Sequence, residues 1–596
     1  MAEKAHAVRN GFLCALAFLV CALIAHPFVQ MGFMDDWSYI WSAREFAHTG
    51  HFAYVWSSPI LGWQLLWGSL FIRLFGFSFN VVRLSALPVA MLSIFLFHSI
   101  LLRFGITARN AVIGALTFGL SPLFLPIATS FMTDVPGICS ILLCIYLCQR
   151  AAEAQTSKAT VLWLLLAAST NLLSGTVRQT SWLGLLIIIP STAVLLRRRR
   201  GVLLAASLSW IAGSVFIYVC LRWFGHQPGS LHEHVFHGIF KDPAHPAIYL
   251  FFQLLGSVLL LLLLVYPLLM PWLPRIARLR TAARVRILAI TSLLSLLQWK
   301  LRWMLPWLFY VIVLEFDSSK PGPVLGKDLL TFPLPPWLRI GIAAFIIVTA
   351  LIAFEYALTK PWQHEEPGTS APHASWREVF WIIGPYSLCY TLLLVPRGLY
   401  NFISDRYLLG LLPIVILLVI MLYQQCIGPR LPHASFVGII CFTAFAVAGT
   451  HDWFAAYRAR LTAINELRSA GAPRAKIQGG FEYDSWTQVE NLHFGYKPLE
   501  LSPFVTRNCA PDFTPLGAPP AQQYTVIYAD KPCLAPSTYP PVSYRAWLPP
   551  FQRQIRISEF RQNQPAPSLG SASGATSRRD RSNVFVNKKE SPMQKK

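Results

Sequence analysis

Residues 11–37 read GFLCALAFLVCALIAHPFVQMGFMDDW, an apolar run that ends in two adjacent carboxylates, Asp35 and Asp36. A helix needs about twenty apolar residues to cross the ~30 Å hydrocarbon core of a bilayer, and this run is long enough. A short basic start, Lys4 and Arg9, precedes it, and no small-residue cleavage site follows it before the acidic pair. We therefore expect a retained membrane anchor rather than a cleaved signal peptide.

Similar apolar runs recur as far as about residue 450, and the composition agrees with them. Of the 596 residues, 55% are hydrophobic and only 13% are charged, whereas a soluble protein usually has about 25% charged residues. This composition excludes a soluble enzyme, a secreted disulfide scaffold and a nucleic-acid-binding protein. We predict a polytopic α-helical membrane protein with about thirteen spans. The predicted spans are residues 11–31, 82–102, 109–127, 134–149, 160–176, 181–196, 202–222, 247–270, 287–314, 338–357, 377–396, 406–424 and 432–450.

The basic residues indicate the orientation. The formal net charge is +23, and much of this charge falls in short loops between apolar runs. Cytoplasmic loops are enriched in Lys and Arg, so we place these loops and the N-terminus in the cytoplasm. Thirteen crossings of the inner (plasma) membrane then leave the C-terminal region outside. The basic clusters are Arg103/Arg109, Arg150/Lys158, Arg197–Arg200 and Arg275/Arg278/Arg280/Arg284/Arg286.

The weakest predicted span is 287–314, because Lys300 and Arg302 fall near its middle. Charged residues at that depth normally face a cavity. If two half-helices replaced this span, the topology downstream would change.

The first outer loop, residues 32–81, is dense in aromatic residues, as is typical of the headgroup layer. Residues 60–75 within it are apolar but too short to span. We expect an amphipathic helix lying in the membrane interface. Its apolar residues at helical spacing are Trp63, Leu66, Trp67, Leu70 and Leu74.

The composition changes after residue 450, which divides the chain into three regions. Residues 1–450 form the predicted transmembrane domain, and 451–561 form a small extracytoplasmic α+β domain in which Tyr524–Tyr528 and Gln554–Ile557 are strand-like. Residues 562–596 are rich in Ser, Gly and Lys, and we expect a disordered basic tail.

Asp35 and Asp36 are the first candidates for chemistry. Two adjacent carboxylates at a helix end can simply mark where the helix leaves the membrane. They can also act, because two like charges side by side raise the pKa of one member of the pair, and partial burial raises it further. One of the two is then a candidate general base near neutral pH.

Asp134 is the second candidate, since it is the only acidic residue between Glu45 and Glu153. It begins a predicted span and falls on the same outer side as Asp35. Its alternative role is that of a helix N-cap, which Asp often fills.

Three arginines of the outer turns, together with the neighbouring Tyr407, form what we call the cationic set: Arg178, Arg397, Arg406 and Tyr407. Basic residues on the outer side run against the usual charge bias and need another reason. An anionic lipid head group is one, because the planar guanidinium matches phosphate oxygens. Snorkelling to the interface is the alternative.

Two weaker signals come from histidine and cysteine. The loop with His226, His232, His234, His237 and His245 has spacing that a metal could use, but a solvated His-rich loop is the better interpretation. No other group has strong ligand spacing, so we predict no metal and no cofactor. Most of the 11 cysteines lie in apolar runs, whereas Cys509 and Cys533 could pair in an oxidising compartment.

In order and topology, residues 1 to about 450 resemble the C-class (GT-C) glycosyltransferases. The resemblance rests on the first span ending in Asp35-Asp36, the interfacial aromatic helix, Thr133-Asp134-Val135-Pro136 before the fourth span and Arg406-Tyr407-Leu408-Leu409 at a late span. The chain is most similar to bacterial members related to protein O-mannosyltransferases and to the lipid A aminoarabinose transferase. It lacks the Trp-Trp-Asp signature of oligosaccharide transferases. The string Gly479-Gly480-Phe481-Glu482-Tyr483-Asp484-Ser485-Trp486 also resembles the C-terminal part of uncharacterised bacterial relatives.

The resemblance implies an inverting enzyme that moves a sugar from a polyprenyl-phosphate donor to an envelope glycolipid, glycan or protein. It implies Asp35 or Asp36 as the general base and Asp134 as a residue that holds acceptor or sugar. Arg178, Arg397, Arg406 and Tyr407 would bind the donor phosphate.

Two other classes of function remain open. A transporter or lipid flippase would favour charges near the membrane middle, as at Lys300 and Arg302. An envelope-assembly protein without catalytic activity would not need the Asp residues.

Overall fold

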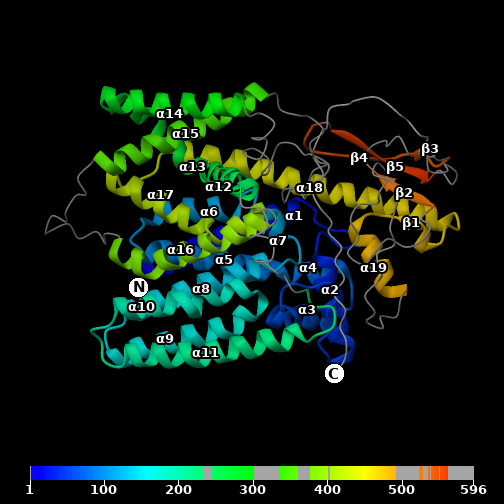
Figure 1. Ribbon diagram of the computed structural model, residues 1–596, viewed down its shortest axis with the longest axis horizontal. Helices are drawn as coiled ribbons and strands as arrows, with labels where there is room; N and C mark the ends of the chain where they lie inside the picture. Colours follow the sequence, from blue (N-terminus) through cyan, green and yellow to red (C-terminus); the bar gives the residue numbers. More distant parts are fainter. Residues whose placement is uncertain are drawn as a thin grey trace.

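Long apolar helices run side by side along the long axis of the molecule, and a small domain of strands and one helix lies at one end of them (Figure 1). In this computed structural model the described residues are 2–231, 244–300, 336–359, 376–400, 403–491, 523–527, 534–536, 538–549 and 551–560.

Eight helical segments of the described residues are long and apolar enough to cross a membrane. A further pair of segments, bent by 66° where they meet, passes the same test as one broken span. The chain is therefore a multi-pass membrane protein. The eight segments are α1 (Ala2–Ile24), α4 with α5 (Phe79–Leu84 and Ala86–Arg103), α8 (Asp134–Glu153), α9 (Ser157–Ser174), α11 (Val202–Gly225), α15 (Pro336–Thr359), α16 (Trp376–Tyr400) and α18 (Ala434–Ser469); the bent pair is formed from α12 (Ala244–Leu264), α13 (Tyr266–Leu269) and η4 (Met270–Arg278).

Shorter helices complete the bundle. Each of the predicted spans overlaps a helix, but the count of thirteen stays a prediction, because only eight or nine segments meet the length criterion among the described residues. The second half of the predicted span 287–314, with Arg302, lies outside the described residues. The shorter helices are α6 (Ala108–Gly119), α7 (Phe124–Ala128), η1 (Gly175–Val177), η2 (Gln179–Trp182), η3 (Gly184–Ile188), α10 (Ile189–Leu195), α14 (Thr281–Lys300), η6 (Asp405–Gly410) and α17 (Leu412–Cys426).

The outermost helices expose apolar side chains, as helices that face lipid must. On α11, Leu204, Ile211 and Tyr218 are 66%, 56% and 62% exposed. Monomeric soluble proteins rarely expose a contiguous apolar surface of this length. The central helix α8 is instead 78% buried over its apolar window, so the bundle has a protein-filled interior and a hydrocarbon-compatible outside.

The basic loops lie together at one end of the bundle, which we call the basic end. Arg103 at the end of α5 pairs with Glu153 at the end of α8. Arg199, in the turn before α11, donates to the carbonyl oxygen of Ala154 at 2.6 Å. Clustering of these loops at one end agrees with the sequence-based assignment of all of them to one side.

The opposite end, which we call the loop end, holds the first outer loop. Here α2 (Asp36–Thr49) packs against α3 (Gly62–Phe75). Leu66, Leu70 and Leu74 form an exposed stripe along α3, as expected for a helix in the membrane interface. Trp63 and Trp67 point elsewhere, because their indole N–H groups donate to backbone carbonyls of other segments at 2.9 and 2.7 Å.

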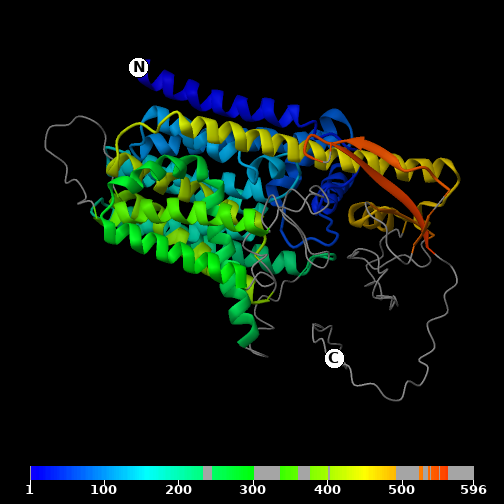
Figure 2. The ribbon, with the colours of Figure 1, turned by 90° about the horizontal axis from the view of Figure 1, so that it is seen from above.

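The small domain also lies at the loop end. Helix α18 runs unbroken across the predicted boundary at residue 450 and continues into this domain (Figure 2). The two predicted strands are present, and the tail 562–596 lies outside the described residues. The remaining elements are η7 (Arg474–Lys476), β1 (Ile477–Gln478), α19 (Phe481–Asn491), β2 (Tyr524–Ile527), β3 (Leu534–Pro536), β4 (Val542–Arg545) and β5 (Gln552–Phe560).

One sheet joins these strands. β5 is antiparallel to β2, β3 and β4, and β1 pairs in parallel with β2. Asp452 on α18 anchors the turn between β4 and β5, because its carboxylate accepts the N–H groups of Trp547 at 2.6 Å and Leu548 at 2.9 Å. The domain is thus fixed to the helix that emerges from the bundle.

Candidate active site

Asp36, the first residue of α2, is enclosed completely. Its side chain has no exposed surface. One carboxylate oxygen accepts the N–H of Phe33 at 2.6 Å. The other accepts Arg83 Nε at 2.8 Å and the N–H of Phe131 at 3.3 Å. Asp36 therefore joins its own loop to α4 and to the loop that leads into α8.

Arg83 is the residue of this cluster that sequence reasoning missed. Its guanidinium is 2% exposed, and besides Asp36 it donates to the carbonyl oxygens of Val29, at 3.0 Å, and Met31. A signal was present, because Arg83 falls just inside the predicted span 82–102, and a charge within an apolar run needs a partner.

Burial raises the pKa of the Asp36 carboxyl, while the Arg83 guanidinium and the N–H groups of Phe33 and Phe131 act in the opposite direction. A buried carboxylate with a guanidinium and two N–H donors is satisfied in its charged form. No part of Asp36 is exposed, so this arrangement favours a supporting role for Asp36.

Asp35 precedes α2 and is placed differently. Its side chain is 24% exposed, and Oδ2 accepts Arg406 Nη1 at 3.1 Å. The two residues are 371 positions apart in the chain. The structure therefore brings the end of the first predicted span to the start of η6.

Asp134 is the first residue of α8, and its side chain is almost fully buried. Thr133 occupies the N-cap position, so the alternative role of Asp134 as the cap residue is wrong. One carboxylate oxygen pairs with Arg178. The other, Oδ2, is buried and has no hydrogen-bond partner among the described residues. Because an unpaired buried oxygen is costly, Oδ2 is a ready acceptor for a ligand hydroxyl.

Tyr407 connects the cationic residues. The guanidinium carbons of Arg178, Arg397 and Arg406 lie 5.3, 5.4 and 5.5 Å from the centre of its ring. Arg397 Nη2 donates to the Tyr407 hydroxyl oxygen at 3.1 Å, and Tyr390 donates to the Tyr407 carbonyl at 2.8 Å. Three guanidinium groups around one aromatic face form an arrangement suited to an anion.

Arg178 is charged in this environment. Burial disfavours the charged guanidinium, but the Asp134 carboxylate and the hydroxyls of Tyr390 and Tyr407 outweigh that effect, so the pKa of Arg178 is raised above its ordinary value. Arg178 therefore offers a permanent positive charge to the cleft.

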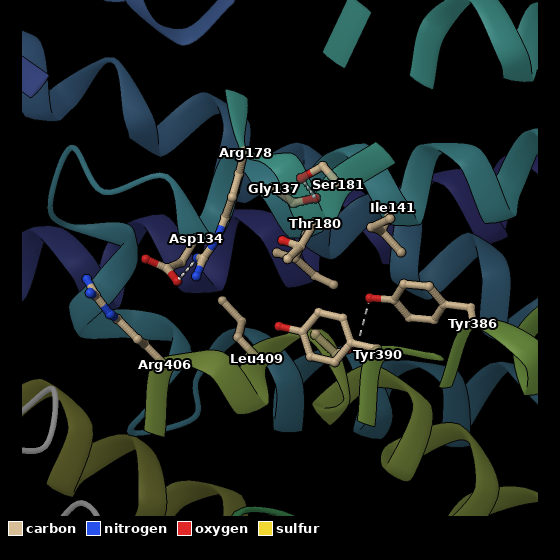
Figure 3. A pocket seen from close by; sticks show the side chains of 12 residues that line it. Asp134, Gly137, Ile141, Arg178, Thr180, Ser181, Tyr386, Tyr390, Arg406 and Leu409 are labelled. Atoms are coloured by element: carbon tan, nitrogen blue, oxygen red, sulfur yellow. Dashed lines mark hydrogen bonds and ion pairs between the residues drawn. The ribbon is translucent and has the colours of Figure 1, made fainter. Parts of the chain in front are cut away.

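Asp134, Arg178, Tyr390 and Arg406 line a narrow cleft that opens to solvent. Asp35 and Tyr407 lie beside this cleft through their contacts with Arg406. Figure 3 shows Asp134 lying between Arg178 and Arg406, with Tyr386 and Tyr390 farther along the cleft. A second, small pocket shares part of this lining and is otherwise apolar. A charged cleft thus continues into an apolar one within the bundle. The residues common to both are Ile138, Ile141, Tyr386 and Gly410.

The predicted site residues therefore fall into two groups. Asp35, Asp134 and the cationic set form one connected cluster at the loop end, and Asp36 supports that cluster from behind. Within the described ranges, no group of three or more His, Cys, Asp or Glu side chains could hold a metal. The histidine, cysteine and arginine residues that gave the weaker sequence signals lie partly outside these ranges, namely His232, His234, His237, Cys509, Cys533 and Arg302.

Comparison with known proteins finds no matching family model and no matching curated protein. Among solved structures, the chain is similar to ArnT from Cupriavidus metallidurans in the apo state, with 15% identity over 77% of this chain and 80% of that one and a TM-score of 0.33. It is also similar to the Archaeoglobus fulgidus oligosaccharyltransferase in the apo form, with 12% identity over 76% and 58% and a TM-score of 0.35. A third is arabinosyltransferase EmbB from Mycobacterium smegmatis, with 13% identity over 69% and 41% and a TM-score of 0.30. At these low scores the likenesses carry no argument for function, which has to come from the site itself.

Proposed function

We propose that the protein is a membrane glycosyltransferase that moves a sugar from a polyprenyl-phosphate donor to a hydroxyl of an envelope glycolipid, glycan or protein. The observation that carries the proposal is the pairing of two carboxylates from separate segments with two arginines that share one aromatic ring. Asp35 pairs with Arg406 and Asp134 with Arg178, and both guanidinium groups lie over Tyr407.

The donor phosphate fits the arginine cluster. Arg178, Arg397 and Arg406 converge from three segments, and a guanidinium binds two phosphate oxygens with parallel hydrogen bonds. Charge develops on the phosphate as it leaves, and fixed donors stabilise such charge in a site that excludes water. Removal of one donor of this kind costs about 2.7–4 kcal/mol in other enzymes.

Phosphate binding also prepares the base. In this structure Arg406 contacts Asp35, so an arriving phosphate competes with the Asp35 carboxylate for the same guanidinium. A carboxylate released from its arginine is a better proton acceptor, because a nearby positive charge favours the deprotonated form. Donor binding and base activation are therefore coupled through Arg406.

The chemical step is a single displacement. The acceptor hydroxyl oxygen attacks the anomeric carbon, and Asp35 takes the hydroxyl proton. The bond between the anomeric carbon and the phosphate oxygen breaks, and its electron pair leaves with the polyprenyl phosphate. Attack from the face opposite the leaving group inverts the anomeric configuration.

Asp134 and the two pockets account for the remaining binding. The unpaired Oδ2 of Asp134 accepts a hydroxyl of the sugar or acceptor. Next to the charged cleft, apolar side chains such as Phe97, Ile100 and Leu142 offer a surface compatible with hydrocarbon. A lipid with a phosphate head matches this order of polar and apolar surfaces.

The charge of the basic loops supports a reaction on the outer face. With the basic end in the cytoplasm, the loop end, the site and the small domain face the extracytoplasmic side of the inner (plasma) membrane. An acceptor in the envelope reaches the site from that side.

The test is mass spectrometry of envelope glycolipids and glycoproteins from a deletion strain that carries the wild-type chain, Asp35→Asn or no copy. We expect one sugar to be missing without the protein, restored by the wild type and not by Asp35→Asn at equal protein level. Unchanged envelope glycans, or full restoration by Asp35→Asn, would overturn the proposal. A lipid-linked sugar retained on the cytoplasmic face, and released outside by Asp35→Asn as well as by the wild type, would identify a flippase instead.

A further inference from the structure

The segment Gly479-Gly480-Phe481-Glu482 lies against α18 so closely that only glycine fits at its first two positions. A Cβ on Gly480 would lie 2.4 Å from Arg460 Nη1, and the residue has a φ of +95°. A Cβ on Gly479 would lie 2.4 Å from the Tyr483 ring. The two glycines thus allow the start of α19 to approach α18.

Because the two helices lie so close, Glu482 at the start of α19 contacts side chains of α18. Its Oε2 accepts Arg460 Nη2 at 2.9 Å, and its Oε1 accepts the Tyr457 hydroxyl. Oε1 also accepts the backbone N–H of Met34 at 3.2 Å. Met34 is 448 positions away and directly precedes Asp35.

The loop that Glu482 contacts has an unusual backbone. Met34 has a φ of +53°, a left-handed conformation that costs a residue with a side chain about 1–2 kcal/mol. Its neighbour Phe33 is held by Asp36. A Cβ on Gly32 would lie 2.5 Å from the Trp37 Cβ and 3.1 Å from the Glu482 Cβ. The loop keeps this shape because the surrounding groups enforce it.

We propose that Glu482 is a positioning residue, which holds Met34 in its left-handed conformation and so fixes the Asp35 carboxylate opposite Arg406. The inference rests on the proposed function, because it assigns to the small domain a role in the geometry of the base. The domain completes the active site of the bundle without touching substrate.

A positioning role has a kinetic signature. Displacement of a reacting group by about 1 Å can cost about 100-fold in rate, while donor binding at Arg178 and Arg397 is unaffected. Loss of the Met34 contact should therefore lower kcat about 10- to 100-fold and change the donor KM by less than about 3-fold.

Two substitutions of Glu482 separate the effect of its side-chain length from the effect of its charge. Glu482→Gln keeps the side-chain length and an oxygen for the Met34 N–H but loses the charge that Arg460 meets. Glu482→Asp keeps the charge but withdraws the oxygens by one methylene. Glu482→Gln should be less stable, because buried Arg460 loses its charged partner. Below its unfolding temperature, full-length Glu482→Gln in lipid nanodiscs should have a kcat close to wild type, whereas Glu482→Asp should be impaired. The opposite order would overturn the inference in favour of a purely electrostatic role.

Asp452→Asn is the matched control. Asp452 is another buried carboxylate that fixes the small domain to α18, but its partners are its neighbour His451, the β4–β5 turn and Arg553 on β5. Its kcat should stay within about 3-fold of wild type. If Asp452→Asn loses as much kcat as Glu482→Asp, general loosening of the domain explains both effects and the inference fails.

Hydrogen–deuterium exchange provides a readout that needs no sugar transfer. Amide exchange in residues 32–37 should speed up in Glu482→Asp and stay at the wild-type rate in Glu482→Gln and Asp452→Asn. Unchanged exchange in Glu482→Asp would overturn the positioning role. If exchange changes as expected but no donor supports transfer by the wild type, the proposed function fails and the loop contact stands.

Discussion

Asp36 and Arg83 form an ion pair that is sealed inside the loop end, with side-chain exposures of 0% and 2% and 2.8 Å between Oδ2 and Nε. Asp35, the next residue along the chain, is 24% exposed and pairs with Arg406, which lines the cleft. Two adjacent aspartates thus have different surroundings: Asp36 is buried in an ion pair, whereas Asp35 is accessible to solvent. Because of this difference, we assign the role of general base to Asp35 and a stabilising role to Asp36, a choice that the sequence left open.

We expect Asp36→Asn to reduce stability before it affects chemistry. Removing one partner of a buried ion pair leaves the other charge uncompensated and typically costs about 3–5 kcal/mol. The variant should show a lower thermal midpoint in detergent and a lower protein level in membranes. Arg83→Met should do the same. An Asp36→Asn protein with wild-type stability but no activity would contradict this assignment.

Asp35→Asn should have the opposite effect: it should lower activity and leave stability unchanged. Its partly exposed pair with Arg406 contributes at most about 1 kcal/mol, so the thermal midpoint should stay near wild type. Loss of the general base should lower kcat by about 100-fold or more. Because the substitution frees Arg406, binding of undecaprenyl phosphate, measured by native mass spectrometry, should equal or exceed that of the wild type. Weaker binding would argue against competition between phosphate and Asp35.

The sequence predicted the parts of the fold that the bilayer dictates. A chain in hydrocarbon has to satisfy its backbone within each helix, so apolar length alone predicts helices at the observed places. The grouping of Asp35, Asp134, Arg178 and Arg406 at one end of the bundle followed from the same reasoning, because all four fall at span ends on one face. Their roles stay predictions.

Contacts between segments that are far apart in the chain could not be predicted from apolar length or span ends. Nothing in the local pattern links Glu482 to Met34, 448 positions away, because that contact exists only once the small domain docks. The continuation of α18 across the predicted boundary at residue 450 has a related reason. Hydropathy falls where α18 leaves the lipid, but the helix continues because Trp453, Phe454 and Ile464 remain buried against protein.

Arg406→Ala should impair use of the donor more than use of the acceptor. The guanidinium is the group that we assign to both the phosphate and Asp35, so its loss should raise the donor KM about 10-fold or more. Arg406→Lys should recover only part of this, since an ammonium cannot bind two phosphate oxygens with a planar fork. Steady-state kinetics with each substrate varied in turn measure the split, and equal effects on both KM values would exclude a phosphate role.

The contact between α2 and α19 should weaken in acid. Glu490 on α19 pairs with Arg44 at 3.0 Å and with Arg474 at 2.6 Å. Partial burial opposes its ionisation, but the two arginines outweigh this and hold the pKa of Glu490 below its ordinary value of 4.5. A lowered folded-state pKa stabilises the fold above the unfolded-state value, and this stabilisation is lost as the pH falls through the folded-state value.

Glu490→Gln isolates this effect, because it removes the titrating group and leaves all others. The difference in thermal midpoint between wild type and Glu490→Gln should be constant from pH 7 to about pH 5 and should shrink below about pH 4.5. A difference that grows in acid would contradict the assignment.

Tyr407 should matter for its ring more than for its hydroxyl. The ring faces three guanidinium groups at 5.3–5.5 Å, whereas the hydroxyl accepts a single hydrogen bond from Arg397. Each cation–π contact contributes about 0.5–2 kcal/mol. Tyr407→Phe should therefore bind undecaprenyl phosphate within about 3-fold of wild type, and Tyr407→Leu should bind it at least about 10-fold more weakly. Equal losses in the two variants would show that the hydroxyl, through Arg397, organises the cluster instead of the aromatic face.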